Sequence, residues 1–160
     1  MVIPPDFTRA ERVITESGAS VTWGGDKAFF NPAVPDAITL PYKSQFPTLQ
    51  DFYGVAFHEL GHFSELKVGW DRKHFHEASQ YAMGELVAEM SACFVANAVD
   101  IPCSDNLDNH TPYLASWLKA MNNDPKFIFQ ASSVATKICD YLVEHKLPQT
   151  GETEETAAAA

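Results

Sequence analysis

Apolar residues recur at helical spacing in the first segment of the chain and then gather in short runs. A helix is predicted over 6–17, with apolar residues at positions 7, 10, 13 and 14, a cap at Asp6 and a stop at Gly18. Three runs typical of β-strands follow, at 20–23, 27–30 and 37–40. Because Gly24-Gly25-Asp26 and two proline-containing turns separate them, we expect a small antiparallel three-stranded meander.

From residue 48 onward the apolar period is helical. Thr48 and Asp51 are spaced for N-capping, and the apolar residues after them predict a helix over about 48–66. Further helices are predicted over about 77–98, from residue 111 onward and over about 124–145, the last two with proline at the first helical turn. One helix, a small sheet and then four helices predict an α+β domain with segregated elements.

The composition is that of an acidic globular domain. The 160 residues are 46% hydrophobic and 20% charged, and no apolar run approaches the roughly 18 residues of a membrane helix. We expect one domain over 1–147, a disordered tail over 148–160 and no membrane contact. The net charge of −10 argues against nucleic-acid binding, which needs basic surfaces. Three cysteines without CxxC spacing, and no secretory signal, favour a cytoplasmic location.

The most specific motif is His58-Glu59-Leu60-Gly61-His62, an HExxH sequence inside an apolar helical run. Two histidines four residues apart on a helix share one face, so both imidazoles can bind one zinc ion. Glu59 points in another direction and is expected to act as general base toward a zinc-activated water. Gly54 and Gly61 in the same helix indicate close packing or ligand access.

The third zinc ligand must come from another segment. We favour Glu85, because Glu85 and Glu89 lie one turn apart on a stripe of apolar or small residues, where two carboxylates repel unless a cation lies beside them. Glu85 is then the direct ligand, and Glu89 holds the outer nitrogen of a ligand histidine. Gly84 is expected to let the two helices approach closely. Alternative ligands are Glu89 itself and the loop histidines His74 and His76, and a solvated pair of acids is the alternative without a metal.

Attack of water on a carbonyl also needs a donor for the developing oxyanion. The candidates are Tyr81, His110 and Tyr113; we assign a catalytic role to His110 and place Tyr81 beside the metal ligands. An exposed loop residue or a helix cap is the alternative for His110. The strand over 37–40 ends just before the motif helix, so it is the candidate edge strand for an extended substrate.

The chain resembles the C-terminal zincin-like metallopeptidase domain of the ArdC antirestriction family, which also occurs in TraC-type plasmid primases and phage polyvalent proteins. The resemblance rests on residues 24–142, in the segments GGDKAFFNP, AFHELGH, YAMGELVAEMSACF and NHTPYLASWLKAMNNDPKFIFQASSVATKICDYL. It implies a zinc site at His58, His62 and an acid of the next helix, with Glu59 as base. It also implies that full-length relatives carry an N-terminal domain that binds single-stranded DNA, which we expect to be absent here. The family usually follows HExxH with Trp-Thr-Gly, whereas this chain has Phe63-Ser64-Glu65.

Two functions from different classes follow. The first is a zinc metallopeptidase that acts on a protein or peptide substrate. The alternative is a zinc-stabilised interaction module, with little or no turnover, that inhibits a restriction enzyme or binds a host protein.

Overall fold

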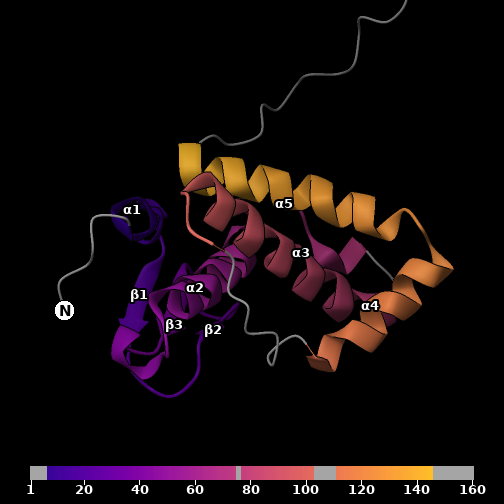
Figure 1. The fold of residues 1–160 in the computed structure, drawn as a ribbon. Coiled ribbons are helices and arrows are strands. Elements are labelled where there is room, and N and C mark those ends of the chain that lie inside the picture. The colour runs from indigo at the N-terminus through magenta and orange to yellow at the C-terminus, as the bar shows by residue number, and fades with distance from the viewer. Residues whose placement is uncertain (1–6, 75–76, 103–110, 146–160) are drawn as a thin grey trace, which may run out of the picture.

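The computed structural model describes residues 7–74, 77–102 and 111–145 (Figure 1). Within these residues, helix α1 (Thr8–Glu16) precedes strands β1 (Ser20–Trp23), β2 (Phe29–Phe30) and β3 (Ala37–Leu40). The helical part then holds α2 (Leu49–Ser64), α3 (Glu77–Ala98), α4 (Thr111–Asn123) and α5 (Phe127–Glu144), with short 3-10 helices η2 (Lys43–Gln45) and η3 (Arg72–His74). The predicted α+β class is confirmed. The predicted tail over 148–160 lies outside the described residues.

The sheet is mixed, and the predicted antiparallel meander is wrong. Its strand order is β1-β3-β2: β1 pairs with β3 in parallel and β2 pairs with β3 antiparallel. The physical reason lies in the segment after β1. Gly24 extends the parallel ladder by donating its N–H to the carbonyl of Leu40 at 2.9 Å, so the two glycines do not close a hairpin. Instead the chain crosses over and returns along the far side of β3.

This topology also corrects the predicted edge strand. β3 occupies the middle of the sheet, where its side chains Ile38 and Leu40 are buried. β2 lies at the edge, with β3 on one side and no other described strand on its other side. Strands β1 and β2, and not the strand over 37–40, therefore form the two edges of the described sheet.

The helices pack in a layer in which α3 lies between α2 and α5 (Figure 1). The predicted cap of α2 is confirmed, because the Thr48 hydroxyl accepts a hydrogen bond from the Asp51 N–H at 3.1 Å. The core joins the sheet to this layer through large side chains of α2 and α3 that are fully buried: Phe52, Tyr53, Phe57, Leu60, Met83, Val87 and Val95. None of the helices in the described part of the chain is long and apolar enough to span a membrane.

Candidate metal centre

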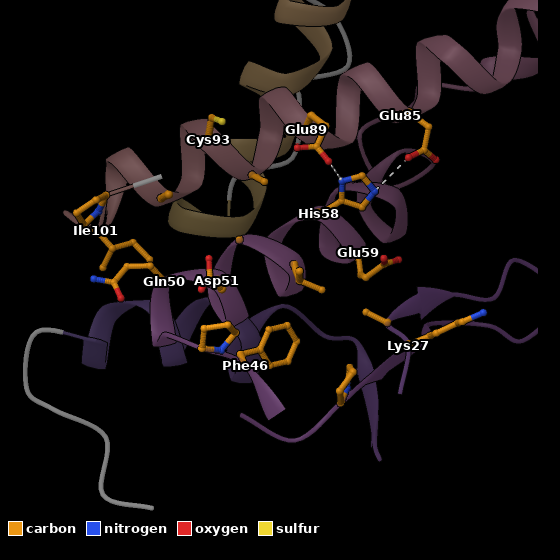
Figure 2. Close-up of a pocket in the computed structure, with 18 of the residues that line it drawn as sticks. Lys27, Phe46, Gln50, Asp51, His58, Glu59, Glu85, Glu89, Cys93 and Ile101 are labelled. Carbon is orange, nitrogen blue, oxygen red and sulfur yellow. Dashed lines mark ion pairs between the residues drawn. The ribbon is translucent and has the colours of Figure 1, made fainter. Parts of the chain in front are cut away.

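Helices α2 and α3 run antiparallel and bring the predicted ligands together (Figure 2). Nε2 of His58 lies 3.1 Å from Nε2 of His62. Glu85 of α3 faces both histidines, at 3.4 Å from His58 Nε2 and 3.3 Å from His62 Nε2. Among the described residues, these three form the group of His, Cys, Asp or Glu side chains whose ligand atoms all lie within 4.8 Å of one another.

The spacing of these atoms fits a small divalent cation. Zinc holds its ligands at about 2.0–2.1 Å, so in a tetrahedral site neighbouring donor atoms lie about 3.3–3.4 Å apart. The separations of 3.1, 3.3 and 3.4 Å between the donors of His58, His62 and Glu85 are close to that spacing. Two imidazoles and one carboxylate are also a donor set that catalytic zinc sites use.

The charges of the cluster favour a cation as well. Burial alone would lower the pKa of His58, but Glu85 and Glu89 outweigh burial and raise that pKa to about 10. The pKa of His62 is also raised, because Glu65 and Glu85 outweigh its burial. Burial alone would raise the pKa of Glu85, yet the two histidines lower it to about 2. The carboxylates thus favour positive charge at the two histidines. A divalent cation bound by the ring nitrogens would supply that charge.

The outer nitrogens of both histidines face carboxylates. Nδ1 of His58 is buried and lies 2.5 Å from Oε1 of Glu89, without the alignment of a good hydrogen bond. Glu89 therefore lies beside the outer nitrogen of His58, one of the candidate ligands. Nδ1 of His62 lies 3.0 Å from Oε1 of Glu65, a buried residue directly after α2. Carboxylates in such positions fix the tautomer and the ring orientation of a metal ligand.

Glu65 is a site residue that sequence reasoning missed. In the sequence, Glu65 is notable only as part of the departure from the family's usual Trp-Thr-Gly segment. Its position, three residues after His62 and so on the same helical face, was the signal that could have found it.

Of the two glycines of the site, Gly61 has the expected role in close packing and Gly84 does not. A β-carbon on Gly61 would stand 3.0 Å from the Cα of Ala88, so Gly61 is where α2 and α3 meet closely. A β-carbon on Gly84 would instead stand 2.1 Å from the guanidinium carbon of Arg72. The prediction that Gly84 provides the close helix contact is therefore wrong: Gly84 makes room for an arginine side chain, and Gly61 makes room for the helix.

Glu59 lies beside the cluster, at the border between α2 and the sheet (Figure 2). Its side chain is buried, and its carboxylate accepts a hydrogen bond from the backbone N–H of Phe30 on β2. Burial raises the pKa of Glu59 above its ordinary value, although His58 and His62 oppose that shift. The HExxH glutamate is thus held by the edge strand and faces the same space as the ligands.

A cavity of about 570 Å³ opens next to His58, Glu59 and Glu85. Figure 2 shows Lys27 and Ile101 toward its opposite ends. Its wall combines polar groups with apolar and small residues, among them Phe46, Gln50, Asp51, Gly54, Val55, Ala92, Cys93, Ala96 and Pro102. A space of this size is typical of pockets that bind small ligands.

Two further candidates from the sequence, Tyr81 and His74, are not part of the cluster. Tyr81 lies one turn before Glu85 on α3, is 58% exposed, and is not among the residues that line the cavity. His74 is exposed at the end of η3 and does not belong to the group of ligand atoms. His76 and His110 lie outside the described residues.

Comparison with known proteins identifies the family. Residues 8–134 match the family model described as zincin-like metallopeptidase. The chain belongs to this zincin-like family. It is 37% identical over 147 residues to a DNA primase TraC of Escherichia coli, which aligns with 90% of this chain but only 10% of the primase. The protein y4eC of Sinorhizobium fredii (strain NBRC 101917 / NGR234) is 32% identical over 155 residues, covering 95% of this chain and 49% of y4eC.

Solved structures agree with this assignment. The Mn(II)-bound crystal structure of the antirestriction protein ArdC from plasmid R388 superposes with a TM-score of 0.73 at 26% identity, over 89% of this chain and 52% of ArdC. The metal-free ArdC structure gives a TM-score of 0.74. The predicted zincin-like fold and the resemblance to ArdC are confirmed. The chain spans about half or less of the length of these relatives.

Proposed function

We propose that this zincin-like domain hydrolyses peptide bonds with a zinc ion held by His58, His62 and Glu85. The observation that carries the proposal is the joint placement of three metal-compatible donor atoms and the buried Glu59 on one cavity. When bound, the ion would supply Lewis acidity for the carbonyl and lower the pKa of water. Glu59 faces the cavity and would accept a proton from the attacking water. Glu59 would then pass that proton to the leaving amine.

The edge strand supports a peptide as the substrate. β2 pairs with β3 through one side only, with Phe29 opposite Thr39 and Phe30 opposite Ile38. The Phe30 N–H reaches Glu59, so the other side of β2 faces the site. An extended peptide laid along that side could pair with the strand backbone and bring one of its carbonyls beside Glu59. Small molecules without an extended backbone would not use this edge.

We propose zinc as the metal. A relative, ArdC, has been crystallised with Mn(II), which supports a divalent ion in this family's fold. The donors here include two imidazoles, which suit zinc, whereas manganese prefers sites richer in oxygen ligands. We also propose that the protein acts in the cytoplasm and that its partner is a protein or peptide substrate.

The experiment is a digest of a peptide library by the zinc-loaded chain, with products read by mass spectrometry. Cleavage by the parent protein and its loss in Glu59→Gln, with zinc content unchanged, supports a peptidase. Absence of cleavage by the zinc-loaded parent argues against it. Inhibition of a restriction enzyme that is equal in the parent and in Glu59→Gln would instead support the interaction module, a function in line with the antirestriction description of ArdC.

A further inference from the structure

Arg72 connects the segment after α2 to a metal ligand. It lies in η3, and its side chain reaches back to Glu65, donating from Nε at 2.9 Å to Oε2 and from Nη2 to Oε1. Nη2 also lies 2.9 Å from Nδ1 of His62. The Arg72 side chain is only 25% exposed and that of Glu65 only 8%, so this fork-like pair is largely withdrawn from water.

Helix α3 provides the seat for this arginine. A β-carbon on Gly84 would stand 2.1, 2.2 and 2.5 Å from three atoms of the Arg72 guanidinium, so no other residue type leaves the guanidinium where it is. Gly84 directly precedes Glu85, the proposed ligand from the same helix. The guanidinium is therefore enclosed between Glu65 and His62 on one side and the backbone of α3 on the other.

The position of Glu65 determines which nitrogen of His62 carries the proton. If Nδ1 donates to Glu65, the Nε2 lone pair is free to bind a metal. If Nδ1 instead accepts a hydrogen bond from Arg72, the neutral ring carries its proton on Nε2 and cannot bind a metal there. Both of these partners lie at hydrogen-bond distance from Nδ1. The metal-binding tautomer is thus favoured when Arg72 donates to Glu65 and Glu65 accepts from Nδ1.

We propose that Arg72 is a positioning residue for the metal centre. It clamps Glu65 against His62, with Gly84 as its seat, and thereby favours the tautomer of His62 that binds the cation through Nε2. The inference rests on the proposed metal site and deepens it, because it makes the segment after HExxH a determinant of metal affinity. It does not depend on whether the domain cleaves peptides.

The test measures the zinc affinity of the full chain by competition with a chromophoric chelator. Loss of a carboxylate that orients a ligand histidine weakens metal binding by roughly 10–100-fold, so we expect Glu65→Ala in that range. Arg72→Ala and Gly84→Ala should each weaken zinc binding by about tenfold, the lower end of that range, because Glu65 remains but is no longer held. The control is Arg12→Ala, which removes the same charge from an exposed ion pair with Glu16 and should leave zinc affinity unchanged.

Two readouts separate positioning from general stabilisation. Arg72→Ala in the Glu65→Ala background should weaken zinc binding less than twofold, because the two residues act through one contact. In the Co²⁺-loaded protein, the visible absorption bands should change in Arg72→Ala and Gly84→Ala but not in Arg12→Ala. Gly84→Ala retains every polar side chain, so it tests the clamp even if Arg72→Ala fails to fold.

The outcomes are distinct. Zinc affinity that is unchanged in both Arg72→Ala and Gly84→Ala would overturn the clamp while leaving the metal site in place. Equal weakening by Arg72→Ala with and without Glu65 would show that Arg72 does not act through Glu65, and would also overturn it. A parent protein that binds no zinc would overturn the metal site itself and, with it, the inference. Zinc binding without peptide cleavage would contradict only the proposed reaction.

Discussion

Gly61 on α2 packs directly against the backbone of Ala88 on α3, so close that a β-carbon on Gly61 would lie 3.0 Å from the Ala88 Cα. This contact lies between two histidine–carboxylate pairs that join the helices at the candidate metal centre. His58 faces Glu89 on one side of it, and His62 faces Glu85 on the other. The distance between the helices at Gly61 therefore sets the distance between the histidines and the carboxylates.

We predict that Gly61→Ala destabilises the protein. In an unconstrained helix, replacing glycine with alanine raises the free energy of unfolding by about 1 kcal/mol. Here the new β-carbon is crowded by the backbone of α3, which cannot change its conformation as a side chain can. Gly61→Leu should cost more, about 1–3 kcal/mol, and should also weaken zinc binding because the helices move apart. Urea unfolding of the metal-free protein gives both free energies. Gly54→Ala, in the same helix but facing the cavity, is the control and should stabilise; a stabilising Gly61→Ala would contradict the close contact.

The parts of the fold that depend on local sequence were predicted well. The apolar period placed α2 and α3 within two residues of their observed ends, and the Thr48 cap is present. The spacing of His58 and His62 required only a helix for both rings to share one face. Glu85 could be chosen because two acids on an apolar stripe are costly without a cation, an argument that holds within a single helix.

The errors concern contacts between distant segments. The turn residues between the strands suggest a hairpin, but the Gly24 N–H donates a hydrogen bond to the carbonyl of Leu40. Nothing near Gly24 in the sequence indicates that partner. The seat of Arg72 on Gly84 likewise joins segments twelve residues apart through a side chain whose direction the sequence does not give. Such features arise from packing of the whole chain, and single-sequence patterns carry little information about them.

We predict that one zinc ion per chain co-purifies and that His58→Ala or His62→Ala removes it. Each substitution deletes one of three protein ligands, and two ligands hold zinc poorly. Inductively coupled plasma mass spectrometry of the desalted protein measures the content. Because a bound ion stabilises only the folded state, addition of zinc should raise the Tm of the metal-free parent but not of either variant.

His145→Ala is the matched control for these substitutions. His145 pairs with Glu16 at 3.2 Å on the surface, far along the chain from HExxH, and its loss should leave zinc content at one per chain. Stoichiometric zinc in both His58→Ala and His62→Ala would show that the ion binds elsewhere.

Glu85→Ala should weaken zinc binding more than Glu89→Ala. Glu85 faces the inner nitrogens of both histidines and is the proposed ligand, whereas Glu89 faces only the outer nitrogen of His58. Loss of the latter contact is expected to cost roughly 10–100-fold in affinity. Chelator competition compares the two variants directly. If Glu89→Ala loses the metal while Glu85→Ala retains it, the ligand assignment of the two acids must be exchanged; if His76→Ala loses it instead, the third ligand lies in the loop.

The last prediction is that this chain binds neither single- nor double-stranded DNA with appreciable affinity. Its net charge is −10, and at least five of its eleven lysines and arginines are already paired with carboxylates in the structure: Arg9 with Asp100, Arg12 with Glu16, Lys43 with Glu11, Lys67 with Asp36 and Arg72 with Glu65. Paired cations cannot replace the counterions of a phosphate backbone without losing their partners, so the salt-dependent gain that drives such binding is small.

The name of the TraC relatives points toward DNA, but the aligned region is only 10–14% of those primases, so their names do not assign DNA binding to this segment. Fluorescence anisotropy with labelled oligonucleotides at roughly 50 mM salt, where electrostatic binding is strong, is the measurement. We expect no saturation at micromolar protein. Sub-micromolar binding with a steep salt dependence would contradict this prediction. Loss of that binding in Lys119→Glu or Lys126→Glu, but not in Lys67→Glu, would then locate the contact near α4 and the start of α5, where the ion pairs named above do not neutralise the lysines.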